Sequence, residues 1–356
     1  KKIISLKNYV LFEKSKTNKL KINKLNSLLL TTSGSTESPK FVRFSYDNIK
    51  NNVQSICENL SINAKHTTIT TMPMAYSYGL SIINTHLFKN GTIILNDSTI
   101  FDKDFWKKIN LHNVNSFGGV PLFYEYLDRL NLNKFTFNKI KYLTQAGGNL
   151  NKEIKKRLLF ILKKRKIKFY IMYGQTEAGP RITTLNLSQN ENKINSVGKP
   201  LKNINITTRL NKQDKIKKNE GELIVKSKGV SLGYANSYKD LKKGDINKGK
   251  LFTGDLGFID NNGFVHVTGR KKRISKIFGI RVDLDEIENF LIKNKIKCRI
   301  NSDDKMLFIK NYSDFSEFKI EKIIQNKYKI NKKFVKIIKQ DRIIKTNFKN
   351  FKIKWI

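Results

Sequence analysis

Cysteine, acidic residues and long apolar runs are all scarce in this sequence of 356 residues. The two cysteines, Cys57 and Cys298, lie far apart, outside any CxxC or histidine-rich stretch, which excludes a disulfide framework and gives no support to a zinc site. A reducing compartment, the cytoplasm, is therefore expected. The longest apolar runs, such as Ser27–Leu30, fall far short of the roughly 18 residues that a membrane span requires.

The first residues, KKIISLKNYVLF, are basic but lack the apolar stretch and small-residue cleavage site of a signal peptide. They also lack an initiator methionine, which leaves a trimmed piece of a longer chain as one interpretation.

The shortage of acidic residues leaves a net charge of +41, from 70 Lys and Arg against 29 Asp and Glu. Such a charge is common in proteins that bind nucleic acids or anionic lipids. Here the basic residues are mostly lysine and spread along the whole chain, and the aromatic residues follow no base-stacking pattern. The pattern favours compositional drift over a specific nucleic-acid partner, which stays as the weaker hypothesis.

Strand-like and helical patterns alternate, which predicts an α/β fold. After Ser45, a residue that can cap a helix, apolar residues recur at helical spacing. A second helix is expected after Asp283, and the pair Asn262-Gly263 predicts a two-residue hairpin turn. Beyond Arg270 the chain shows its own helix, strand, helix and strand pattern, with strands at KMLFIK and FVKIIK and a helix at 315–328. We therefore expect a large domain over 1–271 and a small domain over 272–356.

The stretch TTSGSTESPK, residues 31–40, lies between two expected strands, SLLLTT and FVRFS. Its backbone amides and hydroxyls, together with the cation of Lys40, can surround phosphate oxygens. It is not a Walker loop, because GxxxxGK[ST] is absent. Alone it does not exclude an ordinary surface turn.

Five further segments follow in a fixed order: FYIMYGQTEAGP, SVGKP, GELIVKSKGVSLGY, FTGDLGFID and GRKKRISKIFGIRVDLDEIE. Together with the loop they resemble the adenylate-forming superfamily, which includes acyl- and aryl-CoA synthetases, peptide-synthetase adenylation domains and luciferases. The family loop T-S-G-[ST]-T-G-x-P-K matches residues 32–40 at all positions but one, and the resemblance runs from Leu28 to Glu288.

The resemblance implies an ATP-dependent acid–thiol ligase. A carboxylate attacks the α-phosphate of ATP to give acyl-AMP and pyrophosphate, and a thiol of coenzyme A or of a carrier protein's phosphopantetheine then takes the acyl group. It also implies a large domain of mixed and parallel sheets with helices, followed by a small, mobile α+β domain, and Mg²⁺ as cofactor.

The implied site residues fall into four groups. The catalytic residues are Thr176 on the α-phosphate, Glu177 as the metal ligand, and Lys352. The nucleotide-binding residues are Thr32, Ser33, Gly34, Ser35, Thr36, Lys40, Gly147, Gly148, Tyr173 and Gly174, with Asp255 and Arg270 at the ribose. The acyl pocket has Tyr76 and Gly79, with Gly79 closing a strand and turn that starts at Thr71. The hinge is Lys272, and Lys276 and Gly279 line the path of the thiol.

Three features depart from the family pattern. Glu37 replaces the last loop glycine, at a cost of about 1–2 kcal/mol if that position needs positive φ; an outward-turned side chain would preserve activity but weaken ATP binding. The terminal catalytic motif is altered, so that Lys349 rivals Lys352. Only about 30 residues precede the loop, where the family carries a much longer segment, so the chain is a compact member or lacks an N-terminal portion.

Amino-acid-activating members place an aspartate near Tyr76 to pair with the substrate ammonium, and none occurs between Thr71 and Leu87. An unpaired buried ammonium is costly, so an acyl, hydroxyacyl or aryl acid is favoured. The positive surface suits the phosphates of coenzyme A or an acidic acyl carrier protein equally. The competing hypothesis to the ligase is an impaired homologue that binds adenylates or a carrier protein, suggested by Glu37 and the altered terminal loop.

Overall fold

The computed structural model describes residues 2–6, 9–12, 21–31, 41–130, 132, 135, 139–209, 220–270, 274–277, 280–302 and 306–339. The chain divides into two compact units. The first comprises Lys1–Asp214, Leu223–Thr253 and Phe258–His266, and the second comprises Lys215–Glu222, Gly254–Gly257 and Val267–Ile356. The predicted boundary at Lys272 lies outside the described residues and stays a prediction.

The first unit contains most of the helices and strands. In chain order they are β1 (Lys2–Leu6), β2 (Tyr9–Phe12), β3 (Leu28–Thr31), β4 (Phe41–Phe44), α1 (Tyr46–Leu60), β5 (Thr67–Ile69), α2 (Ser77–Phe88), β6 (Thr92–Ile94), α3 (Lys103–Leu111), β7 (Ser116–Gly119), α4 (Pro121–Arg129), β8 (Tyr142–Gln145), α5 (Lys152–Lys164), β9 (Lys168–Tyr173), η2 (Thr176–Ala178), β10 (Thr183–Asn186), η3 (Glu191–Lys193), β11 (Lys199–Pro200), β12 (Asn205–Arg209), β14 (Gly233–Ala235) and η4 (Tyr238–Lys242). Strands β13 (Gly221–Lys226), β15 (Lys250–Ile259) and β16 (Val265–Arg270) contribute residues to both units.

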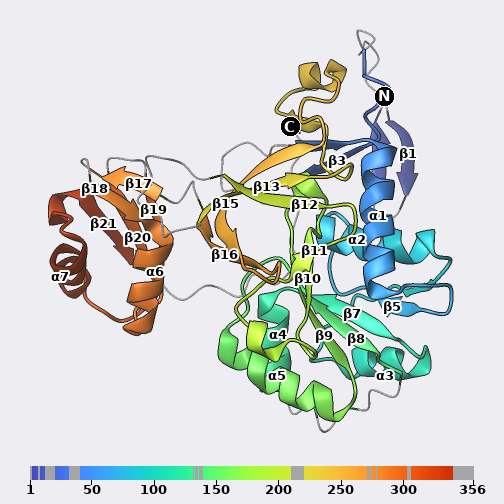
Figure 1. Cartoon of the computed structure of the whole chain (residues 1–356), viewed down its shortest axis with the longest axis horizontal. Helices are drawn as coiled ribbons and strands as arrows, with labels where there is room; N and C mark the ends of the chain where they lie inside the picture. Colours follow the sequence, from blue (N-terminus) through green and yellow to red (C-terminus); the bar gives the residue numbers. More distant parts are fainter. Residues whose placement is uncertain are drawn as a thin grey trace. The chain divides into compact units, whose positions relative to one another are not determined.

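A seven-stranded sheet with the order β11-β10-β9-β8-β7-β5-β6 forms the centre of the first unit. Strands β6, β5, β7, β8 and β9 pair in parallel. Strand β10 pairs antiparallel with β9 on one side and with β11 on the other. Helices connect the parallel strands in turn, and α4 and α5 lie along β8 and β9 in Figure 1. Because the carboxyl ends of parallel strands lie at one edge of the sheet, the segments that follow β7, β8 and β9 emerge together there.

The two faces of this sheet are covered by different helices. Buried apolar residues of α3, α4 and α5 form one core cluster with Phe117 of β7 and Phe169 of β9. Gly118, the next residue of β7, faces the other way, because side chains alternate along a strand. A Cβ at Gly118 would lie 2.6 Å from the hydroxyl of Tyr78 in α2, so the missing side chain lets α2 pack closely on the second face.

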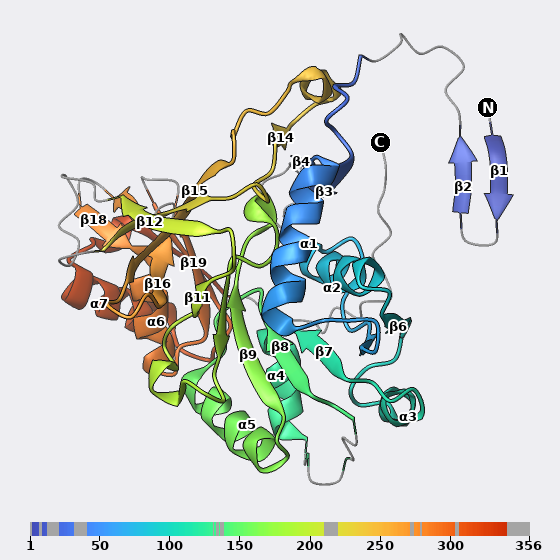
Figure 2. The same cartoon turned by 45° about the vertical axis from the view of Figure 1, so that its right-hand side comes forward.

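Strand β4 belongs to a second, smaller sheet and leads directly into α1. Strands β14, β4 and β3 form a three-stranded antiparallel sheet, and Figure 2 shows β14 beside β4. Ser45 caps α1 as predicted: its hydroxyl accepts from the amide of Asn48, while the Asn48 side chain accepts from the amide of Ser45. This reciprocal capping fixes the point where the chain turns from strand to helix.

The predicted hairpin forms between β15 and β16, but its loop differs from the expected two-residue turn. The Gly263 amide donates to the carbonyl of Asp260 at 2.8 Å, and the Asp260 amide donates to the carbonyl of Phe264 at 2.9 Å. Only Gly263 of the pair takes positive φ, at 79°. The hydrogen bond between Asp260 and Phe264 therefore leaves a loop of three residues. The Asp260 carboxylate stabilises this loop, since it accepts from the amides of Asn262 and Phe264.

The second unit has a separate core. Its elements are β17 (Ile274–Ile277), β18 (Ile280–Asp283), α6 (Leu284–Lys293), β19 (Cys298–Ser302), β20 (Leu307–Asn311), α7 (Glu317–Tyr328), η6 (Lys332–Phe334) and β21 (Val335–Lys339). Strands β19, β20 and β21 form a mixed sheet against which the apolar faces of α6 and α7 pack. Asp283 caps α6, so the predicted helix, and the predicted strands and helix after it, are confirmed within a few residues at their ends. In the part of the chain that the structure describes, no helix is both long and apolar enough to cross a membrane.

Candidate active site

The segment from Tyr173 to Glu177 leaves the central sheet at the carboxyl end of β9. Tyr173 is the last residue of the strand and is half-buried, and Thr176–Ala178 form the short helix η2. A Cβ on Gly174 would lie 2.1 Å from the carbonyl oxygen of Pro180, so only glycine fits where the chain doubles back. Tyr173, predicted to bind the nucleotide, therefore stands at the start of a tight turn at the carboxyl edge of the sheet.

The hydroxyl of Thr176 lies against the beginning of α2. Its Oγ1 is 3.0 Å from Oγ of Ser77, the first residue of that helix. Either hydroxyl can donate, so the pair can reorganise to present one O–H to an acceptor such as a phosphoryl oxygen. Ser77 follows Tyr76 directly, which brings the predicted acyl-pocket segment next to the residue predicted to bind the α-phosphate.

Two hydrogen bonds connect Glu177 to strand β14 and to the segment just before it. The phenol of Tyr234 donates to Oε1 of Glu177 at 2.6 Å, and the amide of Ser231 donates to the Glu177 carbonyl at 2.9 Å. The carboxylate is only partly buried. A hard, accessible carboxylate of this kind is a suitable ligand for Mg²⁺, so the described residues fit the predicted metal role.

The turn after β8 reaches the same neighbourhood through Tyr76. Gly147 has φ of 82°, a conformation that favours glycine, and a Cβ there would lie 2.6 Å from the Tyr76 hydroxyl. Gly148 follows at φ 159°. Burial raises the pKa of Tyr76, so its phenol stays protonated. Two residues predicted for different parts of the site, Tyr76 and Gly147, are thus in direct contact.

Gly79 does not lie in the strand and turn expected from the sequence, and its place in an acyl pocket stays a prediction. Strand β5 already ends at Ile69, and Gly79 lies in the first turn of α2. A Cβ at Gly79 would lie 2.4 Å from the carbonyl oxygen of Pro73. The glycine is needed because the helix packs directly on the backbone of the segment that leads into it.

Asp255 and Arg270, both in the second unit, form the predicted pair. Asp255 is 2% exposed, and Nε of Arg270 donates to its Oδ1 at 2.7 Å. Gly254 precedes the aspartate with φ of 70°, in the left-handed region. The contact between the two side chains agrees with the resemblance, and their role at a ribose stays a prediction.

Several predicted residues cannot be placed in this way. The phosphate-loop residues Thr32, Ser33, Gly34, Ser35, Thr36 and Lys40, together with Glu37, Lys272, Gly279, Lys349 and Lys352, lie outside the described residues. The backbone of Lys276 lies on β17, opposite Arg281 of β18. The predicted functions of all these residues stay predictions.

Two buried arginines near the site were not anticipated from the sequence. Arg43, on β4, is fully buried, and its guanidinium donates to main-chain carbonyls of the β14 region. Arg181, just after the η2 turn, is 2% exposed and lies 5.0 Å from the ring centroid of Tyr78. Burial lowers the pKa of both arginines. The available signal was a lone arginine within the apolar strand FVRF, and another directly after the Thr176–Glu177 motif.

Comparison with known proteins places the chain among nucleotide-dependent enzymes. A family model described as "AMP-binding enzyme" matches residues 11–235. The 2-succinylbenzoate–CoA ligase of Bacillus cereus strain Q1 is 28% identical over 270 residues, which are 75% of this chain and 54% of that protein. The corresponding ligase of Bacillus anthracis is 27% identical over 321 residues, which are 86% of this chain and 64% of that protein. The chain thus spans between about half and two thirds of the length of these relatives.

Solved structures show the same fold. The o-succinylbenzoate coenzyme A synthetase of Bacillus subtilis in complex with ATP and magnesium ion has a TM-score of 0.69 and 24% identity, over 90% of this chain and 67% of that one. McyG A-PCP complexed with phenylalanyl-adenylate has a TM-score of 0.64 and 21% identity, over 95% of this chain and 57% of that one. The predicted α/β architecture is confirmed by this likeness.

Proposed function

Because the chain belongs to the AMP-binding enzyme family, we propose that it joins a carboxylic acid to a thiol at the expense of ATP. A carboxylate oxygen attacks the α-phosphorus, the bond to the β-phosphate oxygen breaks, and pyrophosphate leaves. The thiol then attacks the acyl carbon, and AMP leaves. The observation that carries this proposal is the placement of Thr176 and Glu177, which emerge from the carboxyl end of β9 with side chains oriented by Ser77 and Tyr234.

In this proposal the residues divide the work by chemistry. The hydroxyl of Thr176 donates to an α-phosphoryl oxygen, where negative charge grows during the attack. Glu177 would hold Mg²⁺, which would supply charge neutralisation on the phosphates. The ring of Tyr173 covers one face of adenine, and Asp255 accepts the ribose hydroxyls. The loop residues 32–40 and a terminal lysine, Lys352 or Lys349, complete the phosphate contacts.

The acid is proposed to be an aryl or acyl acid, and the acceptor to be coenzyme A. The first curated relatives act on 2-succinylbenzoate and coenzyme A, as their names state. No aspartate lies between Thr71 and Leu87 to pair with an amino-acid ammonium. An acyl carrier protein is the alternative acceptor, supported by the likeness to McyG A-PCP. The predicted small domain, residues 272–356 with its hinge at Lys272, would serve the two half-reactions in turn.

ATP–pyrophosphate exchange with a panel of aryl, acyl and amino acids tests the first step. We expect Mg²⁺-dependent exchange with an aryl or acyl acid and none with amino acids. Thr176→Ala should lower the exchange rate on the order of 100-fold, as the loss of a transition-state donor does. Glu191→Gln, an exposed charge change on η3, is the control for Glu177→Gln and should leave the rate unchanged. Absence of exchange with every acid, also after Glu37→Gly, would favour the impaired homologue instead.

A further inference from the structure

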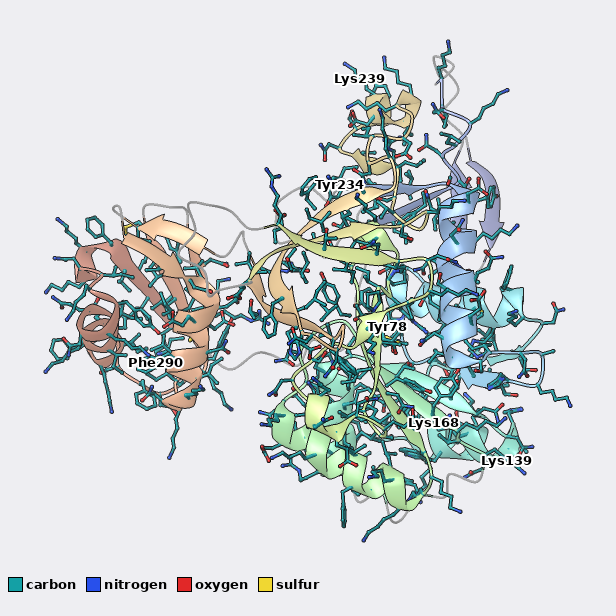
Figure 3. All side chains as sticks on the ribbon, in the orientation of Figure 1. Tyr78, Lys139, Lys168, Tyr234, Lys239 and Phe290 are labelled. Atoms are coloured by element: carbon teal, nitrogen blue, oxygen red, sulfur yellow. The ribbon has the colours of Figure 1, made fainter. Side chains whose placement is uncertain are left out.

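Tyr234 contacts the proposed metal ligand but was not among the site residues predicted from the sequence. Its hydroxyl donates to Oε1 of Glu177 at 2.6 Å, the length typical of a hydrogen bond to a charged carboxylate. The nearby amide of Ser231 holds the Glu177 main chain at 2.9 Å. Figure 3 labels Tyr234, which comes from β14, whereas Glu177 lies in η2, after the central-sheet strand β9.

Strand β14 is in turn held in place by Arg43. The five N–H groups of its guanidinium reach the carbonyls of Leu232, Tyr234, Lys243 and Gly244 and the side-chain oxygen of Asn26, at 2.6 to 3.3 Å. The two strands also pair directly, with Tyr234 opposite Val42. Displacement of the β14 main chain at Tyr234 would therefore require breaking the hydrogen bond from the buried Arg43 and the pairing with β4.

This arrangement connects two distant parts of the proposed site. Strand β4 is the segment that directly follows residues 32–40, the predicted phosphate loop. Through Arg43 and direct pairing, that strand contacts β14, which carries the tyrosine that is bonded to Glu177. A glutamate side chain has several rotamers, and fixing one of them in advance reduces the entropy lost when it binds a cation.

We propose that Tyr234 is a positioning residue for the Mg²⁺–ATP complex. Its hydroxyl holds Oε1 of Glu177 and leaves Oε2 as the oxygen for the cation, while Arg43 keeps β14 in register. This inference rests on the proposed function, because that function assigns the metal to Glu177. A positioning role differs from a structural role in its effect on folding. Because the Tyr234 side chain is 44% exposed, removal of its hydroxyl should hardly affect folding.

The test uses the full chain, with ATP and Mg²⁺ as the probes. Calorimetric titration of ATP at a series of Mg²⁺ concentrations gives the Mg²⁺ concentration for half-maximal binding. We expect Tyr234→Phe to raise this concentration about tenfold, as the loss of a hydrogen bond to a metal ligand does. ATP affinity in excess EDTA should be unchanged, and so should the thermal midpoint. Tyr238→Phe, at another exposed tyrosine 61% accessible on η4, is the matched control and should equal the wild type.

A second variant isolates the contact itself. Glu177→Gln removes the charged acceptor, so Tyr234→Phe should cause no further change in that background. An equal effect of Tyr234→Phe with and without Glu177 would overturn the proposal, as would a half-maximal Mg²⁺ concentration within twofold of the wild type. A lowered thermal midpoint with unchanged Mg²⁺ dependence would assign Tyr234 a structural role and also overturn it.

The two proposals fail in different ways. If the wild type shows Mg²⁺-dependent ATP binding that Glu177→Gln weakens and Tyr234→Phe does not, only the positioning role is refuted. If the wild type shows neither Mg²⁺-dependent ATP binding nor pyrophosphate exchange, the proposed function is refuted, and the role of Tyr234 with it.

Discussion

Replacement of Gly147 by alanine tests whether the turn after β8 is shaped by its contact with Tyr76. Two penalties add at this position. A φ of 82° costs a residue with a Cβ about 1–2 kcal/mol. The new Cβ would also lie 2.6 Å from the Tyr76 hydroxyl and 3.2 Å from Cγ1 of Val120, and relief of such overlap in a packed site costs about 1–3 kcal/mol. We expect Gly147→Ala to lower the free energy of unfolding by about 2–5 kcal/mol.

A double-mutant cycle separates the two penalties. In Tyr76→Phe the nearest ring atom to the new Cβ is Cζ, at 3.7 Å, which is ordinary van der Waals contact. Gly147→Ala should therefore cost less in the Tyr76→Phe background, where the backbone term of about 1–2 kcal/mol and the 3.2 Å contact with Val120 remain. Urea unfolding of the four proteins gives the coupling energy, expected to be at least about 1 kcal/mol. The same cost in both backgrounds would refute the contact as the reason for glycine.

The elements that carry local periodicity could be predicted from the sequence. The apolar spacing after Ser45 and Asp283 gave α1 and α6, and the structure adds the caps that fix their first residues. The hairpin at Asn262-Gly263 was predicted with the wrong loop length. The reason is a side chain: the Asp260 carboxylate accepts two loop amides, which stabilises a three-residue loop over the two-residue turn that the dipeptide favours.

Contacts within the candidate site could be predicted mainly between residues that belong to one continuous sequence motif. Thr176 and Glu177 are neighbours in the sequence and lie at the edge where their motif predicts them. Tyr234 reaches Glu177 across 57 residues, and Arg43 reaches Gly244 across 201 residues. Such contacts follow from the pairing of β4 with β14, which periodicity alone does not specify. A family motif locates the groups proposed to do the chemistry, whereas the contacts of the groups proposed to orient them depend on the assembled sheets.

Two further predictions concern buried polar side chains. Burial lowers the pKa of His86 to about 4, against the opposing hydrogen bond with Ile82. The folded protein therefore binds this proton less readily than the unfolded chain, so stability is complete above about pH 6.5 and falls by up to about 3 kcal/mol as the pH drops toward 4. His86→Gln should remove this part of the slope in urea unfolding between pH 4 and 7, and equal slopes in both proteins would contradict the assignment. Arg43→Met leaves the carbonyls around it buried without donors, so it should lower the free energy of unfolding by about 3 kcal/mol or more. Arg43→Lys, which retains a cation with fewer donors, should lose less. If Arg43→Met lowers the free energy of unfolding by less than about 1 kcal/mol, water can reach the carbonyls that the guanidinium satisfies in the wild type. Strand pairing, and not Arg43, would then be what mainly holds β14.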